Sequence, residues 1–103
     1  FEDYREFVET VSEELPESEI VFVAVKPSIR RWSLWPQMKE LNEQVQSFSG
    51  LHSNLHYADI ATPMLDEDGK PMPELFVQDG LHMTSAGYDI WTDVLGKLLH
   101  SIH

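Results

Sequence analysis

Six consecutive apolar residues, Ile20 to Val25, constrain the fold of this chain more than any other feature of its sequence. Four of the six are β-branched and the run does not alternate, so it predicts a strand that is buried on both faces. Strands of this kind belong to parallel sheets that are covered by helices on both sides. The run is also far too short to cross a bilayer. We therefore expect an α/β fold with parallel strands.

Apolar residues at helical spacing lie on both sides of this run. Residues 3–15 predict an amphipathic helix that stops at Pro16, and residues 36–48 predict a second helix. Residues 55–60 predict a second strand. Strand, helix and strand then follow in the order of a right-handed parallel crossover.

The last third of the chain predicts turns and one more helix. Residues 61–74 contain three prolines, and Asp68-Gly69 predicts a small hairpin there. Thr84 or Ser85 is expected to cap the final helix. Its predicted core stripe is Tyr88, Trp91, Leu95, Leu98 and Ile102.

Composition excludes several classes of function. The 103 residues allow one domain, and 18 acidic against 7 basic residues give a net charge of −11. Such a surface repels phosphate backbones and anionic lipids, so we expect no nucleic-acid partner. The chain has no cysteine, which excludes disulfides, thiolate zinc sites and a cysteine nucleophile. No cofactor or metal is expected, and the cellular compartment is left open.

The segment Asp79-Gly80-Leu81-His82 has the elements of an acid–base pair. A serine hydrolase needs an imidazole whose one nitrogen reaches the nucleophile and whose other nitrogen is held by a carboxylate. Gly80 allows the backbone to turn, so that Asp79 can contact Nδ1 of His82 and leave Nε2 free. A structural turn is the alternative interpretation, because Asp-Gly is a common turn dipeptide.

The block from Phe76 to Tyr88 resembles the last motif block of the SGNH, or GDSL-type, hydrolases, which runs Asp-Gly-Leu-His and then Gly-Tyr. Ile20 to Val25 with Lys26-Pro27-Ser28 is similar to a strand and loop of that family. Leu41-Asn42 and Tyr57 to Ile60 match it as well, so the resemblance covers nearly the whole chain.

This resemblance implies a partial flavodoxin-like three-layer fold and an esterase, lipase or acetylhydrolase activity on small-molecule esters. It assigns Asp79 as the orienting acid and His82 as the general base of a Ser-His-Asp triad. The family's Gly-Asp-Ser nucleophile block and its oxyanion-hole Gly and Asn have no counterpart in this sequence. We therefore expect residues 1–103 to be the C-terminal portion of such a domain, inactive as an esterase by themselves.

Three further expectations follow. Two strands make an unstable sheet, so the run 20–25 is expected to pair with its copy in a homo-oligomer. A non-catalytic interaction or scaffold module with the same fold surface is the alternative function. An acidic helical adaptor with an accidental Asp-Gly-Leu-His match is a third possibility, and separated Asp79 and His82 side chains would favour it.

Two other clusters are weaker candidates. Arg30 and Trp32, in the loop after the first predicted strand, are candidates for substrate contact, although packing of the rings with the guanidinium in water is the favoured interpretation. His52 and His56 have the spacing of two metal ligands but lack a third. We therefore interpret both histidines as solvent-exposed.

Overall fold

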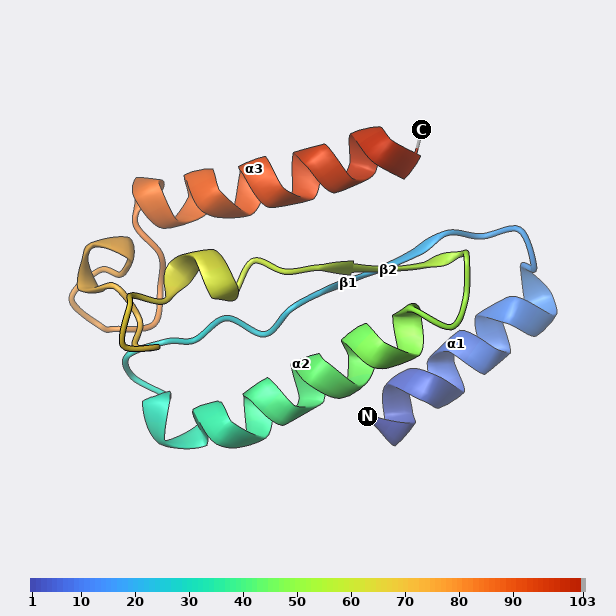
Figure 1. The fold of residues 1–103 in the computed structure, drawn as a ribbon, viewed down its shortest axis with the longest axis horizontal. Coiled ribbons are helices and arrows are strands. Elements are labelled where there is room, and N and C mark those ends of the chain that lie inside the picture. The colour runs from blue at the N-terminus through green and yellow to red at the C-terminus, as the bar shows by residue number, and fades with distance from the viewer. Residues whose placement is uncertain (103) are drawn as a thin grey trace.

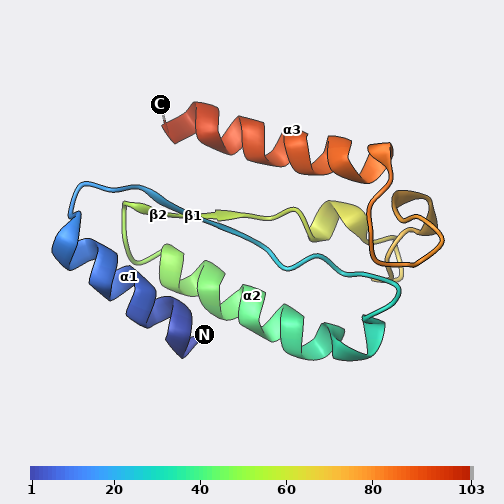
Figure 2. The same cartoon turned by 180° about the vertical axis from the view of Figure 1, so that it is seen from behind.

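The computed structural model describes residues 1–102, which form three layers. A sheet of two parallel strands, β1 (Ile20–Val23) and β2 (Leu55–Ala58), lies in the middle. The helices α1 (Glu2–Glu14) and α2 (Trp35–Ser49) cover one side, and α3 (Ser85–Ile102) lies on the other (Figures 1 and 2). The predicted α/β class, with parallel strands and flanking helices, is confirmed.

Both strands end two residues earlier than their sequence patterns predict. The Ala24 N–H still donates to the Ala58 carbonyl, at 3.0 Å. At the next residue the buried side chain of Asn42 takes the place of a neighbouring strand. The Val25 N–H donates to Asn42 Oδ1 (2.9 Å), and Asn42 Nδ2 donates to the Val25 carbonyl (3.0 Å). Asn42 therefore ends β1 and ties its exit to α2.

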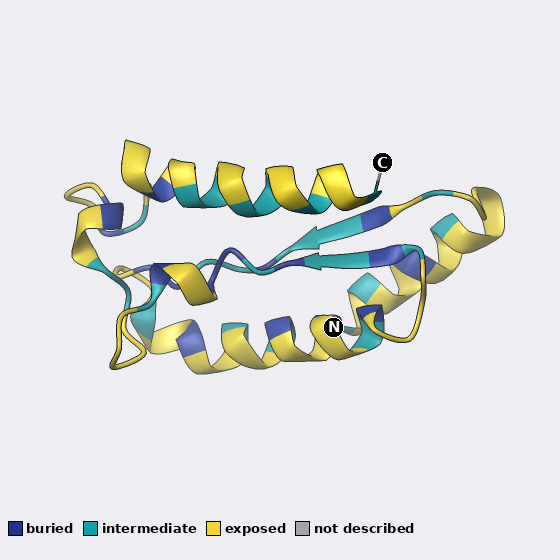
Figure 3. Cartoon of the chain, turned by 45° about the horizontal axis from the view of Figure 1, so that its top comes forward, coloured by how far each residue is buried: buried dark blue, intermediate teal, exposed yellow. Residues whose placement is uncertain are grey.

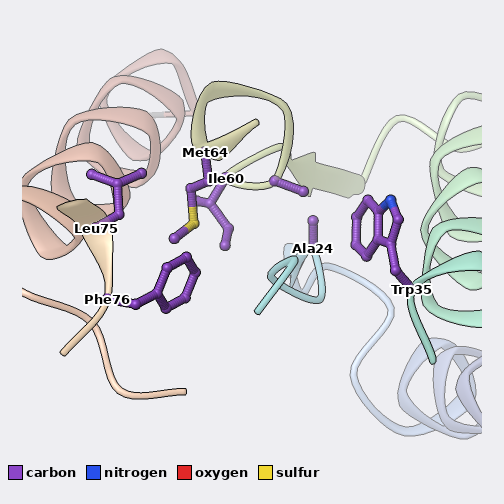
Figure 4. Packing of buried hydrophobic residues seen from close by; sticks show 7 residues of the cluster. Ala24, Trp35, Ile60, Met64, Leu75 and Phe76 are labelled. Carbon is purple, nitrogen blue, oxygen red and sulfur yellow. The ribbon is translucent and has the colours of Figure 1, made fainter. Parts of the chain in front are cut away.

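The main core cluster lies at the carboxyl ends of the strands. Figure 4 shows Trp35 on one side of Ala24 and the side chains of Met64, Leu75 and Phe76 on the other. Three residues of α3 pack against this cluster: Ile90, Trp91 and Val94. A smaller cluster of Val8, Ile20 and Leu55 attaches α1 to the opposite ends of the strands.

Two predictions about burial are not met in full. Tyr88 lies 47% exposed instead of in the core stripe of α3. Residues 21–23 of β1 are only half-buried, although helices lie on both faces of the sheet as expected (Figure 3). Within residues 1–102 no strand pairs with the second edge of β1. The side chains of β1 therefore lack the neighbours that a further strand would place beside them.

The segment between β2 and α3 consists of short turns that return the chain to the carboxyl ends of the strands. Single 3-10 turns occupy Thr62–Met64 and Pro73–Leu75. The predicted small hairpin is present, with Leu65 bridged to Pro71 and Gly69 at a φ of 76°. No helix within residues 1–102 is long and apolar enough to cross a membrane.

Candidate active site

A closed turn precedes α3 and carries Asp79 and His82. Phe76 and Met83 form an antiparallel bridge at its base. Inside it, the Val77 N–H donates to the His82 carbonyl and the Gly80 N–H donates to the Val77 carbonyl, both at 2.9 Å. The backbone therefore fixes the separation of Asp79 and His82 before their side chains interact.

The two side chains pair as the sequence predicts. Asp79 Oδ1 accepts the backbone N–H groups of Leu81 and His82, each at 2.9 Å. Asp79 Oδ2 contacts Nδ1 of His82. Because an ionised carboxylate only accepts, Nδ1 carries the proton in the neutral ring and Nε2 keeps a free lone pair. The His82 side chain is 72% exposed, so Nε2 is open to a reacting group.

The hydrogen bonds to Asp79 also determine its charge. The hydrogen bond from His82, followed by those from the Leu81 and His82 backbone, holds the pKa of Asp79 well below its ordinary value. Asp79 is therefore a carboxylate at neutral pH. In this state it holds the imidazole of His82 through Nδ1.

This pKa shift predicts a pH-dependent contribution to stability. Asp79 takes up a proton more readily in the unfolded chain, where its pKa is near 3.8, than in the folded one. Its contribution is therefore complete above that value and is lost as the pH falls towards the folded pKa. We expect the unfolding free-energy difference between the wild type and Asp79→Asn, from urea denaturation, to shrink steadily below about pH 4. A difference that grows with acid would contradict the assignment.

The loop that follows β1 contacts the turn that carries Asp79 and His82. The Arg30 N–H donates to the Gly80 carbonyl at 2.9 Å. Ser28 is buried, and its Oγ accepts the Arg31 N–H at 3.2 Å, which holds this loop in shape. Gly80 has a φ of 68°, and an added Cβ would lie 3.2 Å from the Arg30 nitrogen and 3.3 Å from Ile29 Cβ. Glycine is thus required at position 80 both by the backbone conformation and by the close approach.

Gly69 provides a matched control for this requirement, because it has a φ of 76° but open space around its Cβ position. We expect Gly69→Ala to lower the unfolding free energy by about 1 kcal/mol, the cost of a left-handed conformation. Gly80→Ala adds steric contact and should cost about 2–3 kcal/mol. Urea denaturation of both variants measures the difference. Equal losses would show that the Arg30 loop does not press on the turn.

Lys26 lies near this site, at the mouth of a groove. The groove holds about 330 Å³ and is lined by Val23, Ala24, Lys26, Ile60, by Met83 of the turn, and by Tyr88 and Trp91 near the start of α3. Partial burial lowers the pKa of Lys26, and the nearby Asp79 carboxylate opposes this effect. Most side chains that line the groove are apolar, and Lys26 is the one cation among them.

The weaker candidates have structural partners. The Trp32 ring stacks on Trp35, with centroids 6.0 Å apart, and packs against the main core cluster. The side chain of Arg30 is exposed, and its described contact with the turn is through its backbone. These contacts are those of loop packing, and a role of Arg30 or Trp32 in substrate contact stays a prediction.

The two histidines with metal-ligand spacing have different neighbours. His52 packs edge-on against the Phe48 ring at 5.0 Å. His56 lies in β2, with Nε2 2.6 Å from the Glu19 carboxylate and a side chain that is 20% exposed. Its predicted solvent exposure is therefore wrong, because the strand places it beside an acidic residue. Within residues 1–102 no three potential ligands come together as a metal site.

Sequence reasoning missed two supports of the site. The Arg30 contact joins residues 50 positions apart, and no local pattern indicates it. Thr84 was expected as a helix cap, and its Oγ accepts the Gly87 N–H at 3.4 Å. The same hydroxyl also donates to the Glu74 carbonyl at 2.9 Å, which anchors the start of α3 to the preceding loop.

Comparison with known proteins gives two structural likenesses. No family model and no curated protein matches the sequence. The esterase domain of the ORF1 protein from the zebrafish ZfL2-1 retrotransposon matches 97% of this chain, at 27% identity and a TM-score of 0.80. A Streptococcus pneumonia protein, provisionally described as a platelet activating factor, matches 90% at 19% identity and a TM-score of 0.74.

The matches cover 56% and 47% of those two proteins, so this chain spans about half the length of the structures it resembles. The second likeness, at its lower identity, concerns the fold alone. The first likeness, at 27% identity, is to a protein described as an esterase domain. Over the part that it matches, the chain therefore has the fold of an SGNH (GDSL-type) hydrolase, as its motifs predict.

Proposed function

We propose that this chain is the C-terminal portion of an SGNH-type ester hydrolase domain and supplies the acid and the base of a Ser-His-Asp triad. The observation that carries the proposal is the contact of Asp79 with His82 Nδ1, on a turn at the carboxyl ends of parallel strands. Open α/β sheets bind their ligands at this edge. Likeness to an esterase domain supports the same reaction class.

In this proposal His82 acts through Nε2. A serine hydroxyl from a segment outside this chain gives its proton to Nε2 while its oxygen bonds to the ester carbonyl carbon. The resulting imidazolium, held by Asp79, returns the proton to the departing alcohol as the carbon–oxygen bond breaks. Water then attacks the acyl-enzyme by the same proton route and releases the carboxylic acid.

The chain alone should be inactive, because no serine of the family's nucleophile block is present in it. Ser28, in the loop behind the turn, is buried with its hydroxyl bonded to Arg31. We expect no hydrolysis of 4-nitrophenyl acetate above that of the His82→Ala variant. Hydrolysis by the isolated chain that His82→Ala abolishes would show a nucleophile within it and contradict this expectation.

The decisive test adds the missing part. The region of the zebrafish esterase domain that lies outside the match is co-expressed with this chain, and the purified complex is assayed on the same ester. We expect hydrolysis that neither polypeptide shows alone. A stable complex without hydrolysis would reject the catalytic proposal and favour a non-catalytic interaction module.

A further inference from the structure

Positive charge is concentrated in one stretch of this acidic chain. Residues 20–39 contain none of its 18 acidic residues but four of its seven basic residues, which are Lys26, Arg30, Arg31 and Lys39. Eight acidic residues precede this stretch, in α1 and the turn after it, at the opposite end of the sheet from the Asp79–His82 turn (Figure 1). The acid–base pair therefore lies in the basic part of the molecule.

Two of these cations, Lys26 and Arg31, lie close to the acid–base pair. Partial burial lowers the pKa of Lys26, the Asp79 carboxylate raises it, and the Arg31 guanidinium lowers it further. The backbone gives the same arrangement, because the loop that holds Arg31 donates the Arg30 N–H to the Gly80 carbonyl, at 2.9 Å. Arg31 is exposed, and Lys26 lines the wall of a groove, so a ligand can reach both side chains.

No carboxylate neutralises this pair of cations. Neither Lys26 nor Arg31 forms an ion pair within residues 1–102. The nearby Asp79 carboxylate is already engaged, since Oδ2 contacts Nδ1 of His82 and Oδ1 accepts two backbone N–H groups of the turn. Two like charges held near each other without a partner repel, and an anion close to both relieves that repulsion. The arrangement therefore offers a place for an anionic group beside the acid–base pair.

We propose that Lys26 and Arg31 hold an anionic group of the substrate, so that the preferred substrate is an ester with a free carboxylate. The substrate class rests on the proposed function, whereas the anion subsite itself does not. A guanidinium binds a carboxylate through two parallel N–H groups, and an ammonium adds a further charge-assisted hydrogen bond. The net charge of −11 favours a monoanion, because the field of the whole protein repels a dianion about twice as strongly.

Binding to this chain, without hydrolysis, tests the subsite. The probes are monomethyl glutarate, an ester with one carboxylate, and dimethyl glutarate, a neutral ester with the same carbon skeleton. Each is titrated into the isotope-labelled chain, and the dissociation constant is taken from the movement of backbone amide resonances. We expect monomethyl glutarate to bind about tenfold more tightly, as one charge-assisted contact implies, and to move the amides of Lys26, Arg31 and the turn at residues 77–82.

Substitutions identify the cations responsible. Arg31→Gln should weaken the binding of monomethyl glutarate about tenfold, and Arg31→Lys, which keeps the charge, should lose less. Lys26→Met should weaken it by a similar factor. Circular dichroism checks the folding of this half-buried variant, and the exposed Arg31 decides the matter if Lys26→Met does not fold. Lys39→Met is the matched control, because it removes one charge from the same stretch but lines a different pocket, beside Tyr57 and Asp59. It should bind within about twofold of the wild type.

Three results would overturn the proposal. They are equal affinity for the two esters, tighter binding of inorganic phosphate than of monomethyl glutarate, and equal losses from Arg31→Gln and Lys39→Met, which would indicate only the general field of the protein. Failure of the proposed function gives a different result. Binding of the anionic ester by this chain, with no hydrolysis by the complex with the zebrafish region, would reject the triad and keep the subsite. Hydrolysis by that complex, with no anion binding by this chain, would do the reverse.

Discussion

Replacement of His82 by alanine in the completed enzyme should lower kcat for ester hydrolysis by about 1,000-fold or more, since general bases contribute about 10²–10⁴-fold and triad members act as a unit. Without the imidazole nothing accepts the serine proton at the turn. Asp79→Ala should lower kcat by a comparable factor, because the ring then loses the acceptor that holds Nδ1. The rates are measured on the complex with the zebrafish region.

His100→Ala is the matched control for this substitution. His100 lies exposed in the last turn of α3, far along the helix from the turn at residues 77–82. Its loss should leave kcat within about twofold of the wild type, as expected for an exposed residue away from the reacting groups. Circular dichroism checks that the variants remain folded. If His82→Ala retained the rate, His82 would not be the base.

Gly87→Ala should be the most destabilising single substitution at the junction of the turn and α3. An added Cβ would lie 2.7 Å from the Leu75 carbonyl oxygen and 2.9 Å from Met83 Cβ. Neither atom moves easily, because the Leu75 carbonyl accepts the Thr84 N–H at 2.8 Å and Met83 is bridged to Phe76. We expect a loss of about 3 kcal/mol in unfolding free energy, at the upper end for overpacking.

Gly96→Ala tests the same change in the same helix without the contact. Gly96 is exposed, and nothing lies within 4 Å of its Cβ position. Alanine should therefore stabilise α3 by about 0.5–1 kcal/mol, through helix propensity alone. Urea denaturation of the two variants should give shifts of opposite sign. If Gly87→Ala stabilised the protein as Gly96→Ala does, the close approach of position 87 to Leu75 would not determine stability.

Local features of the fold were predictable because local interactions produce them. The helices were placed within one or two residues by apolar spacing and by Pro16 and Gly50. The parallel pairing of the strands also follows from the order of the elements. Strand ends were not predictable, because the end of β1 depends on the side chain of Asn42, which lies 17 residues from Val25 in the sequence.

The Asp79–His82 pair shows the same difference between features set by local sequence and features set by distant contacts. By itself the sequence indicated that these side chains can meet, because they are three residues apart and Gly80 permits the turn between them; the structure shows the contact. Only the tertiary structure decided that the Arg30 loop supports this turn, that Tyr88 lies exposed and that no strand within residues 1–102 pairs with the second edge of β1. These features depend on which segments pack against one another. The periodicity of apolar residues shows which side chains of a segment can be buried. It does not show which segment covers them, because that segment lies elsewhere in the chain or in another polypeptide.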